Sequence, residues 1–210
     1  MVSVKEISIK PAWKMNSTIK TIIVSLYRTN CYLFINEDTK ECVIIDPGDE
    51  ADVIRKVIST REVIPKAILL THGHGDHVSA LNEIKKEYEI EVYASGDEQF
   101  FLKDYEIEHS VRENDIVRAA GFELKVIETP GHSKGSLCYY CEDQNILFSG
   151  DTMFYMTYGR TDFETGSFED MKQSMKKLFN LPGDTRVYPG HGFSTTIAIE
   201  SVKNAILMDI

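Results

Sequence analysis

The sequence lacks the features that would place it in a membrane or on nucleic acid. No apolar run in its 210 residues approaches the ~20 residues needed to cross a bilayer. Lys and Arg are outnumbered by Asp and Glu, and the formal net charge of -10 argues against non-specific binding to nucleic acid or an anionic membrane. The opening residues, Met1 to Ile7, lack the apolar core of a signal peptide. We therefore expect a cytoplasmic protein.

Cysteine is also scarce, since the chain has four: Cys31, Cys42, Cys138 and Cys141. Cys138 and Cys141 have the spacing of a redox motif. They lie in a strand-like run, however, where residues three apart point to opposite faces. We therefore expect four free, mostly buried thiols rather than a redox pair.

The remaining composition is ordinary for a globular protein, and we expect residues 1–210 to form one domain. Apolar periodicity predicts strands at 1–10, 21–26, 31–35, 41–46, 66–70, 91–94, 122–127, 136–140, 145–149 and 186–188. It predicts helices at 51–60, at 78–88 with Ser79 near its start, at 97–103, after the N-cap Ser167, and after His191. This order indicates an α/β fold whose sheets pack on helices on one face and on each other on the other face.

The densest chemical signal is Thr71-His72-Gly73-His74-Gly75-Asp76-His77, which holds three of the six histidines. An apolar run precedes it and helical spacing follows it, so the cluster lies on a strand-to-helix loop that can face a cleft. Two imidazoles two residues apart can reach one metal ion, because the glycines let the backbone bend between them. Asp76 and His77 are adjacent, so the turn must aim them at a second position. Histidine nitrogen with carboxylate oxygen is the ligand set of zinc or non-haem iron.

Three further candidate ligands, His132, Asp151 and His191, each follow an apolar strand and stand beside a glycine. Strand ends can present side chains into a shared crevice. We therefore expect two metal ions, the first on His72, His74 and His132, the second on Asp76, His77 and His191, with Asp151 bridging them. The sixth histidine, His109, lies in a polar stretch and is expected to be solvated.

The charge balance of such a site favours hydrolysis. Two divalent ions bring about four positive charges, and two aspartates remove about two. One bound hydroxide leaves roughly one positive charge, which favours an anionic transition state. Zinc lowers the pKa of bound water to ~7, so that hydroxide is available at neutral pH. Zn²⁺ is the expected metal, and iron or a mixed iron and zinc pair fits the same ligands.

Four short motifs then match a known family: the histidine loop, Thr129-Pro130-Gly131-His132-Ser133, Ser149-Gly150-Asp151 and Pro189-Gly190-His191-Gly192. Together they resemble the metallo-β-lactamase superfamily, and the branch most similar is glyoxalase II, the hydroxyacylglutathione hydrolases. The match spans nearly the whole chain, from the strand at Thr29 to Tyr32 and the Asp46-Pro47-Gly48 turn to His191. The resemblance implies a four-layer αββα sandwich with mixed sheets, and a dinuclear site at one edge between them.

By that resemblance, a hydroxide carried by the metal pair attacks the carbonyl of a thioester or ester. The expected substrate is a small molecule such as a glutathione thioester. One ion polarises the carbonyl oxygen, and the other steadies the nucleophile and the leaving group. Asp76 is then catalytic as well as a ligand, because it can hydrogen-bond the hydroxide and manage its proton. The motifs specify the fold and the metal site and say much less about the substrate.

The chain departs from glyoxalase II in two places. That family carries a further C-terminal helical domain that supplies part of its glutathione clamp, and the residues after His191 are too few for it. The family also has a Gly-Lys-x-Tyr element that holds a glutathione carboxylate, where this chain has Gly159-Arg160-Thr161-Asp162-Phe163. Arg160 keeps the positive charge and is predicted to bind a substrate carboxylate bidentately. An ion pair with a neighbouring carboxylate is the alternative.

Other functions remain open on the sequence alone. A persulfide dioxygenase, a sister branch that also carries a Gly-Arg-Thr-Asp run, would use one iron on His72, His132 and Asp151. A nuclease of the superfamily would need a large cap or basic arm, which this acidic chain lacks. A scaffold with a structural zinc would need neither a second metal position nor a bridging carboxylate.

Overall fold

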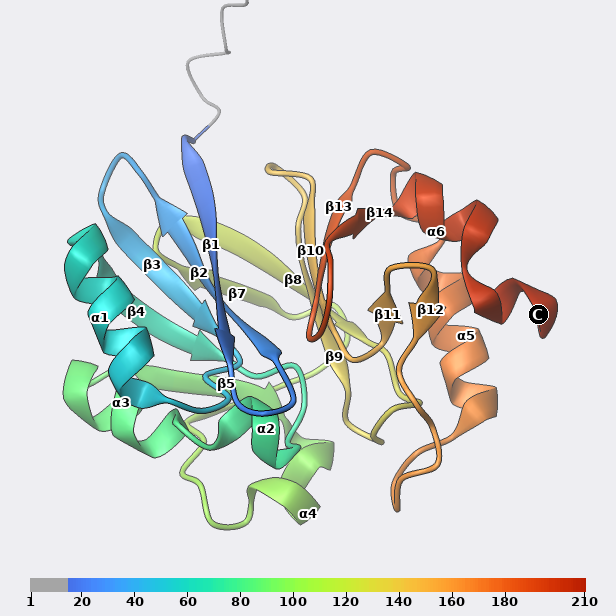
Figure 1. The fold of residues 1–210 in the computed structure, drawn as a ribbon, viewed down its shortest axis with the longest axis horizontal. Helices are drawn as coiled ribbons and strands as arrows, with labels where there is room; N and C mark the ends of the chain where they lie inside the picture. Colours follow the sequence, from blue (N-terminus) through green and yellow to red (C-terminus); the bar gives the residue numbers. More distant parts are fainter. Residues whose placement is uncertain (1–14) are drawn as a thin grey trace, which may run out of the picture.

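The computed structural model describes residues 15–210, so the strand expected at 1–10 lies outside the described residues. The described chain forms two six-stranded sheets that face each other, with helices on both outer faces (Figure 1). The strand order is β1-β2-β3-β4-β5-β6 in the first sheet and β14-β13-β10-β9-β8-β7 in the second. This is the αββα arrangement that the resemblance implied.

The first sheet and its helices take up the N-terminal part of the described chain. Its strands are β1 (Ser17–Val24), β2 (Thr29–Asn36), β3 (Glu41–Ile45), β4 (Ile64–Leu69), β5 (Glu91–Ser95) and β6 (His109–Val111). Its helical segments are α1 (Ala51–Arg61), α2 (Gly75–Val78), α3 (Leu81–Tyr88), η1 (Gly96–Glu98) and α4 (Gln99–Leu102). The strands β3 to β6 run parallel, and the hairpin β1–β2 pairs antiparallel with β3.

The second sheet follows in the C-terminal part. Its strands are β7 (Ile116–Ala119), β8 (Phe122–Glu128), β9 (Leu137–Cys141), β10 (Ile146–Gly150), β13 (Arg186–Pro189) and β14 (Thr195–Thr196). A small hairpin, β11 (Met153–Phe154) with β12 (Thr157–Tyr158), stands beside it. Its helices are α5 (Phe168–Leu178), α6 (Ile197–Lys203) and η2 (Ala205–Met208). None of the helices in residues 15–210 has both the length and the apolar character to span a bilayer.

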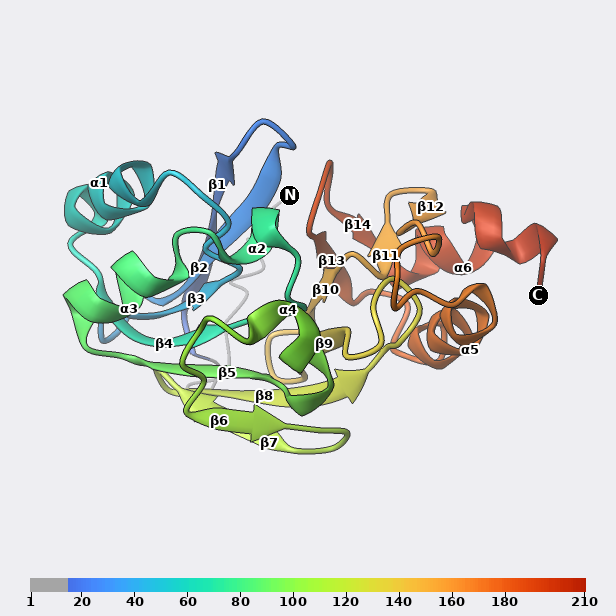
Figure 2. The same cartoon turned by 90° about the horizontal axis from the view of Figure 1, so that it is seen from below.

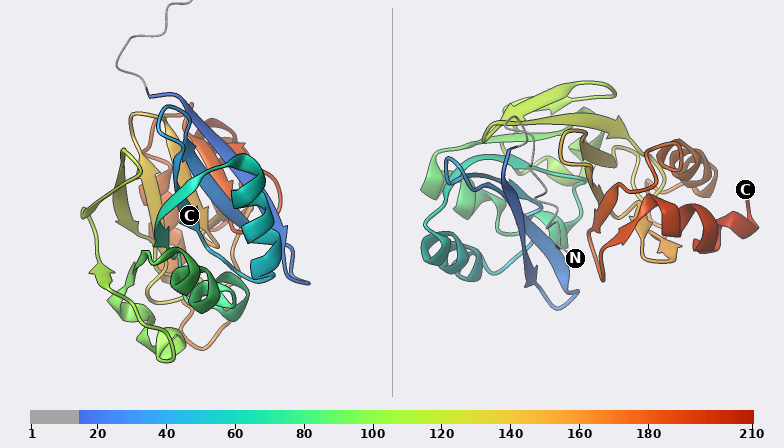
Figure 3. Two further views of the ribbon diagram at one scale, coloured as in Figure 1. Left: turned by 90° about the vertical axis from the view of Figure 1, so that its left-hand side faces the viewer. Right: turned by 90° about the horizontal axis from the view of Figure 1, so that it is seen from above.

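Three apolar clusters separate the four layers, and the alternation of strand residues produces them. Along β2, Cys31, Leu33 and Ile35 pack under α1 and α3, while Tyr32 and Phe34 face the second sheet. Phe34 stacks on Phe122 across the two sheets, with ring centroids 3.7 Å apart. A third cluster joins the outer face of the second sheet to Met171, Met175 and Leu178 of α5. Figure 3 shows these helices on opposite outer sides of the sandwich.

The four cysteines are free and buried, as the sequence predicted. Cys138 points into the cluster under α5, whereas Cys141, three residues along the same strand, points between the sheets. Ser167 caps α5 as expected, because its Oγ accepts a hydrogen bond from the Asp170 backbone N–H.

The prediction of one helix at 78–88 is wrong at its N-terminal end, because the structure has two helices there. α2 begins at Gly75 and ends at Val78, so Ser79 ends a helix instead of starting one. The backbone N–H groups of Ser79 and Ala80 donate to the carbonyls of Gly48 and Pro47. The loop after β3 therefore takes the Ala80 donor and shares the Ser79 donor, which also bonds the Gly75 carbonyl of α2.

The carboxyl ends of β3, β4, β8, β10 and β13 meet at one edge of the sandwich. β3 and β4 are parallel, β10 and β13 are parallel, and β8 runs with β10 because β9 is antiparallel to both. Seen from below, α2 and α4 lie at this edge, between the first sheet and the part that carries β11 and α5 (Figure 2). The loops that leave these five strand ends can therefore share one site.

Candidate metal centre

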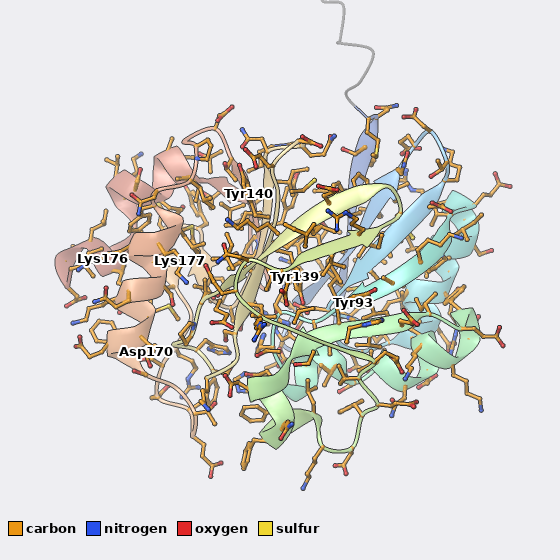
Figure 4. The ribbon with its side chains drawn as sticks, turned by 180° about the vertical axis from the view of Figure 1, so that it is seen from behind. Tyr93, Tyr139, Tyr140, Asp170, Lys176 and Lys177 are labelled. Atoms are coloured by element: carbon orange, nitrogen blue, oxygen red, sulfur yellow. The ribbon has the colours of Figure 1, made fainter. Side chains whose placement is uncertain are left out.

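Tyr139 fixes the start of the histidine loop from the opposite sheet. Its hydroxyl donates to the carbonyl oxygen of Leu70 at 2.9 Å, directly before Thr71. The backbone N–H of Leu137 donates to the Thr71 carbonyl at 2.8 Å. Figure 4 shows Tyr139 on β9 near Tyr93, while its neighbour Tyr140 packs in the cluster under α5. The loop that carries His72 and His74 is thus anchored to both sheets.

The structure brings His72, His74 and His132 together as the first trio. Each offers one ligand atom, and these atoms all lie within 4.8 Å of one another. Nδ1 of His74 lies 2.9 Å from Nε2 of His132, so the two nitrogens point at the same place. His72 and His132 are buried, while His74 is partly exposed at the edge of the cleft.

Asp76, His77 and His191 form the second trio, beside the first. Their ligand atoms also lie within 4.8 Å of one another. Nε2 of His77 lies 3.3 Å from Nε2 of His191, and Oδ2 of Asp76 lies 3.4 Å from the same His191 nitrogen. The adjacent residues Asp76 and His77 therefore aim at one position, as the turn between them was expected to arrange.

Asp151 lies between the two trios. Its Oδ2 is 3.5 Å from Nε2 of His132 in the first trio and 3.4 Å from Nε2 of His191 in the second. Its Oδ1 is 3.4 Å from Nε2 of His77. One carboxylate thus reaches donors of both trios, which is the placement that a bridging ligand needs.

The other ring nitrogen of four histidines is held by an acceptor. Nδ1 of His132 donates to the Arg160 carbonyl at 2.8 Å, and Nδ1 of His191 donates to the Tyr27 carbonyl at 3.1 Å. Nδ1 of His77 donates to the Asp46 carboxylate at 3.0 Å. Because the Thr71 hydroxyl donates to Asp46, its oxygen accepts from Nδ1 of His72. Each Nε2 is therefore left facing the other candidate ligands, where a metal ion can bind it, the arrangement typical of metal-binding imidazoles.

Two unpaired atoms test whether a metal fits these residues. Within residues 15–210, the buried side-chain polar atoms without a hydrogen-bond partner are Nε2 of His72 and Oδ1 of Asp151. A buried polar atom without a partner is costly, so such an atom calls for an explanation. Both belong to the ligand set expected from the sequence, and a cation would satisfy both lone pairs. The donor set of nitrogen and carboxylate oxygen fits a divalent metal.

Burial and charge set the protonation of the site. Burial and the neighbouring histidines lower the pKa of His72 well below its usual range and that of His74 to about 4. Burial raises the pKa of Asp76 and Asp151, but nearby histidines outweigh it and lower both values. For His191, hydrogen bonds to Asp151 and Asp76 overcome the effect of burial and raise the pKa to about 10. Ionised carboxylates and neutral His72 and His74 are the states that bind metal.

Two glycines let the backbone approach Asp151 closely. A Cβ at Gly190 would lie 2.1 Å from Oδ1 of Asp151, and a Cβ at Gly159 would lie 1.8 Å from the Asp151 carbonyl oxygen. Both contacts are far closer than atoms can approach, so no other residue fits either position without a shift of the site. Gly190, the residue before His191, is therefore glycine for a steric reason.

A cleft of about 820 Å³ opens onto both trios. Aromatic side chains form much of its wall, and the edges of Phe101 and Phe163 pack against the His74 ring with centroids 4.7 and 4.8 Å away. Arg160 lines the same cleft and donates two hydrogen bonds to Asp162, at 2.6 and 2.7 Å. The structure therefore shows the ion pair, while a role of Arg160 in substrate binding stays a prediction.

Two residues that hold candidate ligands in place were not predicted from the sequence to belong to the site. Asp46 follows strand β3 and holds His77, and Thr29 donates from its hydroxyl to Oδ2 of Asp76 at 2.8 Å. Asp46 carries the same signal as the expected ligands, because it comes directly after an apolar strand. Thr29 carries no such signal, since a threonine at the start of a strand is ordinary. His109 lies outside both trios, on β6, where its ring stacks on Tyr93.

The family comparison agrees with this geometry. The model of the metallo-beta-lactamase superfamily matches residues 24–191, and the chain belongs to that superfamily. It is 34% identical to the probable metallo-hydrolase YqgX of Bacillus subtilis (strain 168), over 86% of this chain and 92% of that protein. It is 33% identical to the hydroxyacylglutathione hydrolase GloC of Haemophilus influenzae, over 90% of this chain and 97% of that protein. The likeness to GloC fits the glyoxalase II-like branch.

Solved structures give the same fold. The BLEG-1 B3 metallo-beta-lactamase superposes with a TM-score of 0.85 at 33% identity, covering 90% of this chain and 99% of that one. ETHE1 from Myxococcus xanthus gives 0.81 at 29% identity, covering 90% and 83%. TTHA1623, solved in a di-iron-bound form, gives 0.81 at 30% identity, covering 89% and 99%. The metallo-beta-lactamase fold implies that the chain binds divalent metal, and the two trios are candidate groups for it. A third group, Asp46 with His72 and His77, shares its histidines with the two trios.

Proposed function

We propose that the protein hydrolyses a thioester or ester bond at a dinuclear metal site, with a substrate of the hydroxyacylglutathione type. The observation that carries this proposal is the position of Asp151 between two complete trios, with Oδ1 unpaired in a buried place. The likeness to a protein named hydroxyacylglutathione hydrolase supports the substrate class. Zn²⁺ suits these ligands, and a di-iron relative makes iron or a mixed pair an equal fit for the donor set.

The seven metal ligands of this proposal are His72, His74, Asp76, His77, His132, Asp151 and His191. When bound, a divalent pair lowers the pKa of coordinated water to about 7 and polarises a carbonyl oxygen. In the reaction, water adds to the acyl carbon, the bond from carbon to sulfur breaks, and the thiol leaves with a proton.

The protein contributes position and proton transfer. Asp76, ionised and held by the Thr29 hydroxyl, lies beside His191 at the cleft and can take the proton of the attacking water. Phe101 and Phe163 cover the ring of His74 and limit the access of bulk water to the base of the cleft. Arg160 lines the cleft and offers its guanidinium to a carboxylate of the substrate. The four free thiols fit the reducing cytoplasm, where we place the protein.

A second candidate function is persulfide dioxygenation at a single iron. His132 and Asp151 lie 3.5 Å apart beside His72, and these three residues form the two-histidine, one-carboxylate face that such iron sites use. The Gly159 to Asp162 run favours this candidate, and ETHE1 from Myxococcus xanthus is among the structural relatives. Against it, the second trio is complete, which a single iron does not require.

The deciding experiment begins with metal quantitation on protein purified without added metal. The same sample is then assayed for hydrolysis of hydroxyacylglutathione and for oxygen uptake with glutathione persulfide. Two ions per chain and thioester hydrolysis support the hydrolase. One iron per chain with persulfide-dependent oxygen uptake rejects it in favour of the dioxygenase.

A further inference from the structure

Glu98 is a buried acid that belongs to neither trio. It is the last residue of η1, and its exposed fraction is 1%. Within residues 15–210, its carboxylate forms no ion pair, and the nearby Lys134 pairs with the exposed Asp97 instead. A buried carboxylate is costly unless donors satisfy its oxygens, so its partners show what it does.

The partners of Glu98 come from the two loops that carry the first trio. Oε2 accepts from the backbone N–H of Gly73 at 2.7 Å, and Gly73 stands between His72 and His74. Oε1 accepts from the backbone N–H of Gly135 at 2.8 Å and from the Ser133 hydroxyl at 2.7 Å. Ser133 directly follows His132. One carboxylate therefore joins the loop of two ligands to the loop of the third.

The surrounding backbone is shaped around this carboxylate. A Cβ on Gly73 would lie 2.9 Å from Oε2 of Glu98, and a Cβ on Gly135 would lie 2.8 Å from Oε1. The absence of side chains at these two positions lets both N–H groups reach the acid directly. All three partners are donors, and the two carboxyl oxygens of Glu98 accept from all of them.

We infer that Glu98 is a positioning residue that fixes the spacing of His72 and His74 against His132. The inference rests on the proposed metal-binding role of the first trio. The second trio has separate supports, since Asp46 holds His77 and Thr29 holds Asp76. Loss of Glu98 therefore weakens the ion on the first trio and leaves the ion on the second trio in place.

The test compares metal binding by the wild type, Glu98→Gln and the control Asp97→Asn. Asp97 is the exposed neighbour of Glu98, so its variant removes a charge from the same turn and loses only a water-exposed ion pair with Lys134, while the three donors to Glu98 stay in place. Zn²⁺ affinity is measured for each of the two ions by competition with a chelator of known strength. In Glu98→Gln, we expect the affinity of one ion to fall about 10- to 100-fold while the other stays within a few fold. Asp97→Asn should match the wild type.

Each result has one meaning. Two wild-type ions that bind Glu98→Gln with unchanged affinity overturn the inference and leave the proposed function standing. An equal loss at both ions, with a lower Tm, shows a general structural role and also overturns it. If the wild type binds only one ion and Glu98→Gln binds it more weakly, the inference stands and the dinuclear function is rejected. If the wild type binds no metal, both the inference and the proposed function are rejected.

A second variant keeps the test usable if Glu98→Gln does not fold. Ser133→Ala removes one of the three donors to Glu98 and leaves the carboxylate and its two backbone partners. We expect a loss of a few fold at the first ion alone. Unchanged binding of both ions by this variant would then count against the positioning role.

Discussion

The carboxylate of Asp46 accepts a hydrogen bond from Nδ1 of His77 at 3.0 Å, and both side chains are buried. The same carboxylate accepts from the backbone N–H and the hydroxyl of Thr71, whose oxygen in turn accepts from His72. One acid thus orients a ring in each trio. Partners of this kind fix the tautomer and the direction of a metal-binding imidazole.

Asp46→Asn should therefore weaken both ions. Oδ2 of Asp46 accepts from both His77 and the Thr71 hydroxyl, and Oδ1 accepts from the Thr71 backbone N–H. An amide has one acceptor oxygen, so the donors at one of these two positions lose their acceptor. We expect metal affinity to fall about 10- to 100-fold at the second trio, with a smaller loss at the first. Competition titration with Zn²⁺ measures both values. Thr29→Val removes the donor to Asp76, together with a contact to Ser25 outside the site, and should weaken the second ion alone. Wild-type affinities in Asp46→Asn would contradict the role of Asp46 in orienting His72 and His77.

Asp151→Ala should lose more metal than His132→Ala. Asp151 lies within 3.5 Å of donors in both trios, whereas His132 belongs to the first trio only. We expect Asp151→Ala to lose most of both ions and His132→Ala to lose mainly one, each with loss of activity. Metal content per chain, measured beside far-ultraviolet circular dichroism, separates this effect from unfolding. Unchanged metal content in both variants would reject the ligand assignment.

Arg160→Ala should raise KM for glutathione thioesters with little change in kcat. The ion pair with Asp162 is exposed to water and therefore holds the guanidinium weakly, so a substrate carboxylate can replace it. Loss of one charge-assisted contact corresponds to a rise in KM on the order of tenfold. Asp162→Asn frees Arg160 and should lower KM. Steady-state kinetics measure both effects, with Lys134→Ala as a control that removes another exposed positive charge. Equal KM values for the wild type and Arg160→Ala would show that Arg160 does not bind the substrate.

The buried thiols should make the protein less stable at alkaline pH. Burial raises the pKa of Cys42 and Cys138 to about 12 and that of Cys141 to about 11. An unfolded thiol titrates near its usual pKa of ~8.5, so above that pH the unfolded chain loses protons that the folded chain keeps. The free energy of unfolding therefore falls as pH rises from about 9 to 11. Urea denaturation across this range checks the slope, which Cys42→Ala should reduce.

The native thiols should also resist alkylation. A thiol reagent reacts with thiolate, and the buried groups are protonated and covered at neutral pH. All four should react in denaturant and none at a comparable rate in the folded protein. Fast labelling of Cys138 and Cys141 in the native state would revive the redox interpretation of their spacing.

The residues that meet in the two trios could be picked out from the sequence because one rule covers them. Each follows an apolar strand, and His72, Asp151 and His191 stand where the ends of parallel strands meet. The αββα fold, which the family resemblance implied and the order of strands and helices also indicated, was confirmed by the structure. Most strand and helix boundaries lie within a few residues of the predicted ones, since apolar runs end where the chain leaves the core.

Other parts could not be predicted, for identifiable reasons. β6 and β7 are strands of only three and four residues at the sheet edges, too short to show a clear periodic pattern. The break between α2 and α3 depends on hydrogen bonds from Ser79 and Ala80 to a loop far away in the sequence. The role of Glu98 could not be predicted for the same reason, because it depends on two loops that only the folded chain brings to this residue.

Each trio takes donors from both sheets, and this has a consequence for how the chain folds. His74 and His132 are separated by 58 positions, and His77 and His191 by 114. An ion shared by such pairs cross-links the two sheets and closes a long loop, which restricts the unfolded chain in the way that a covalent cross-link does. A nascent chain that has not yet reached His191 cannot complete the second trio. If both proposed ions bind, full metal loading therefore waits until both halves of the sandwich have been made.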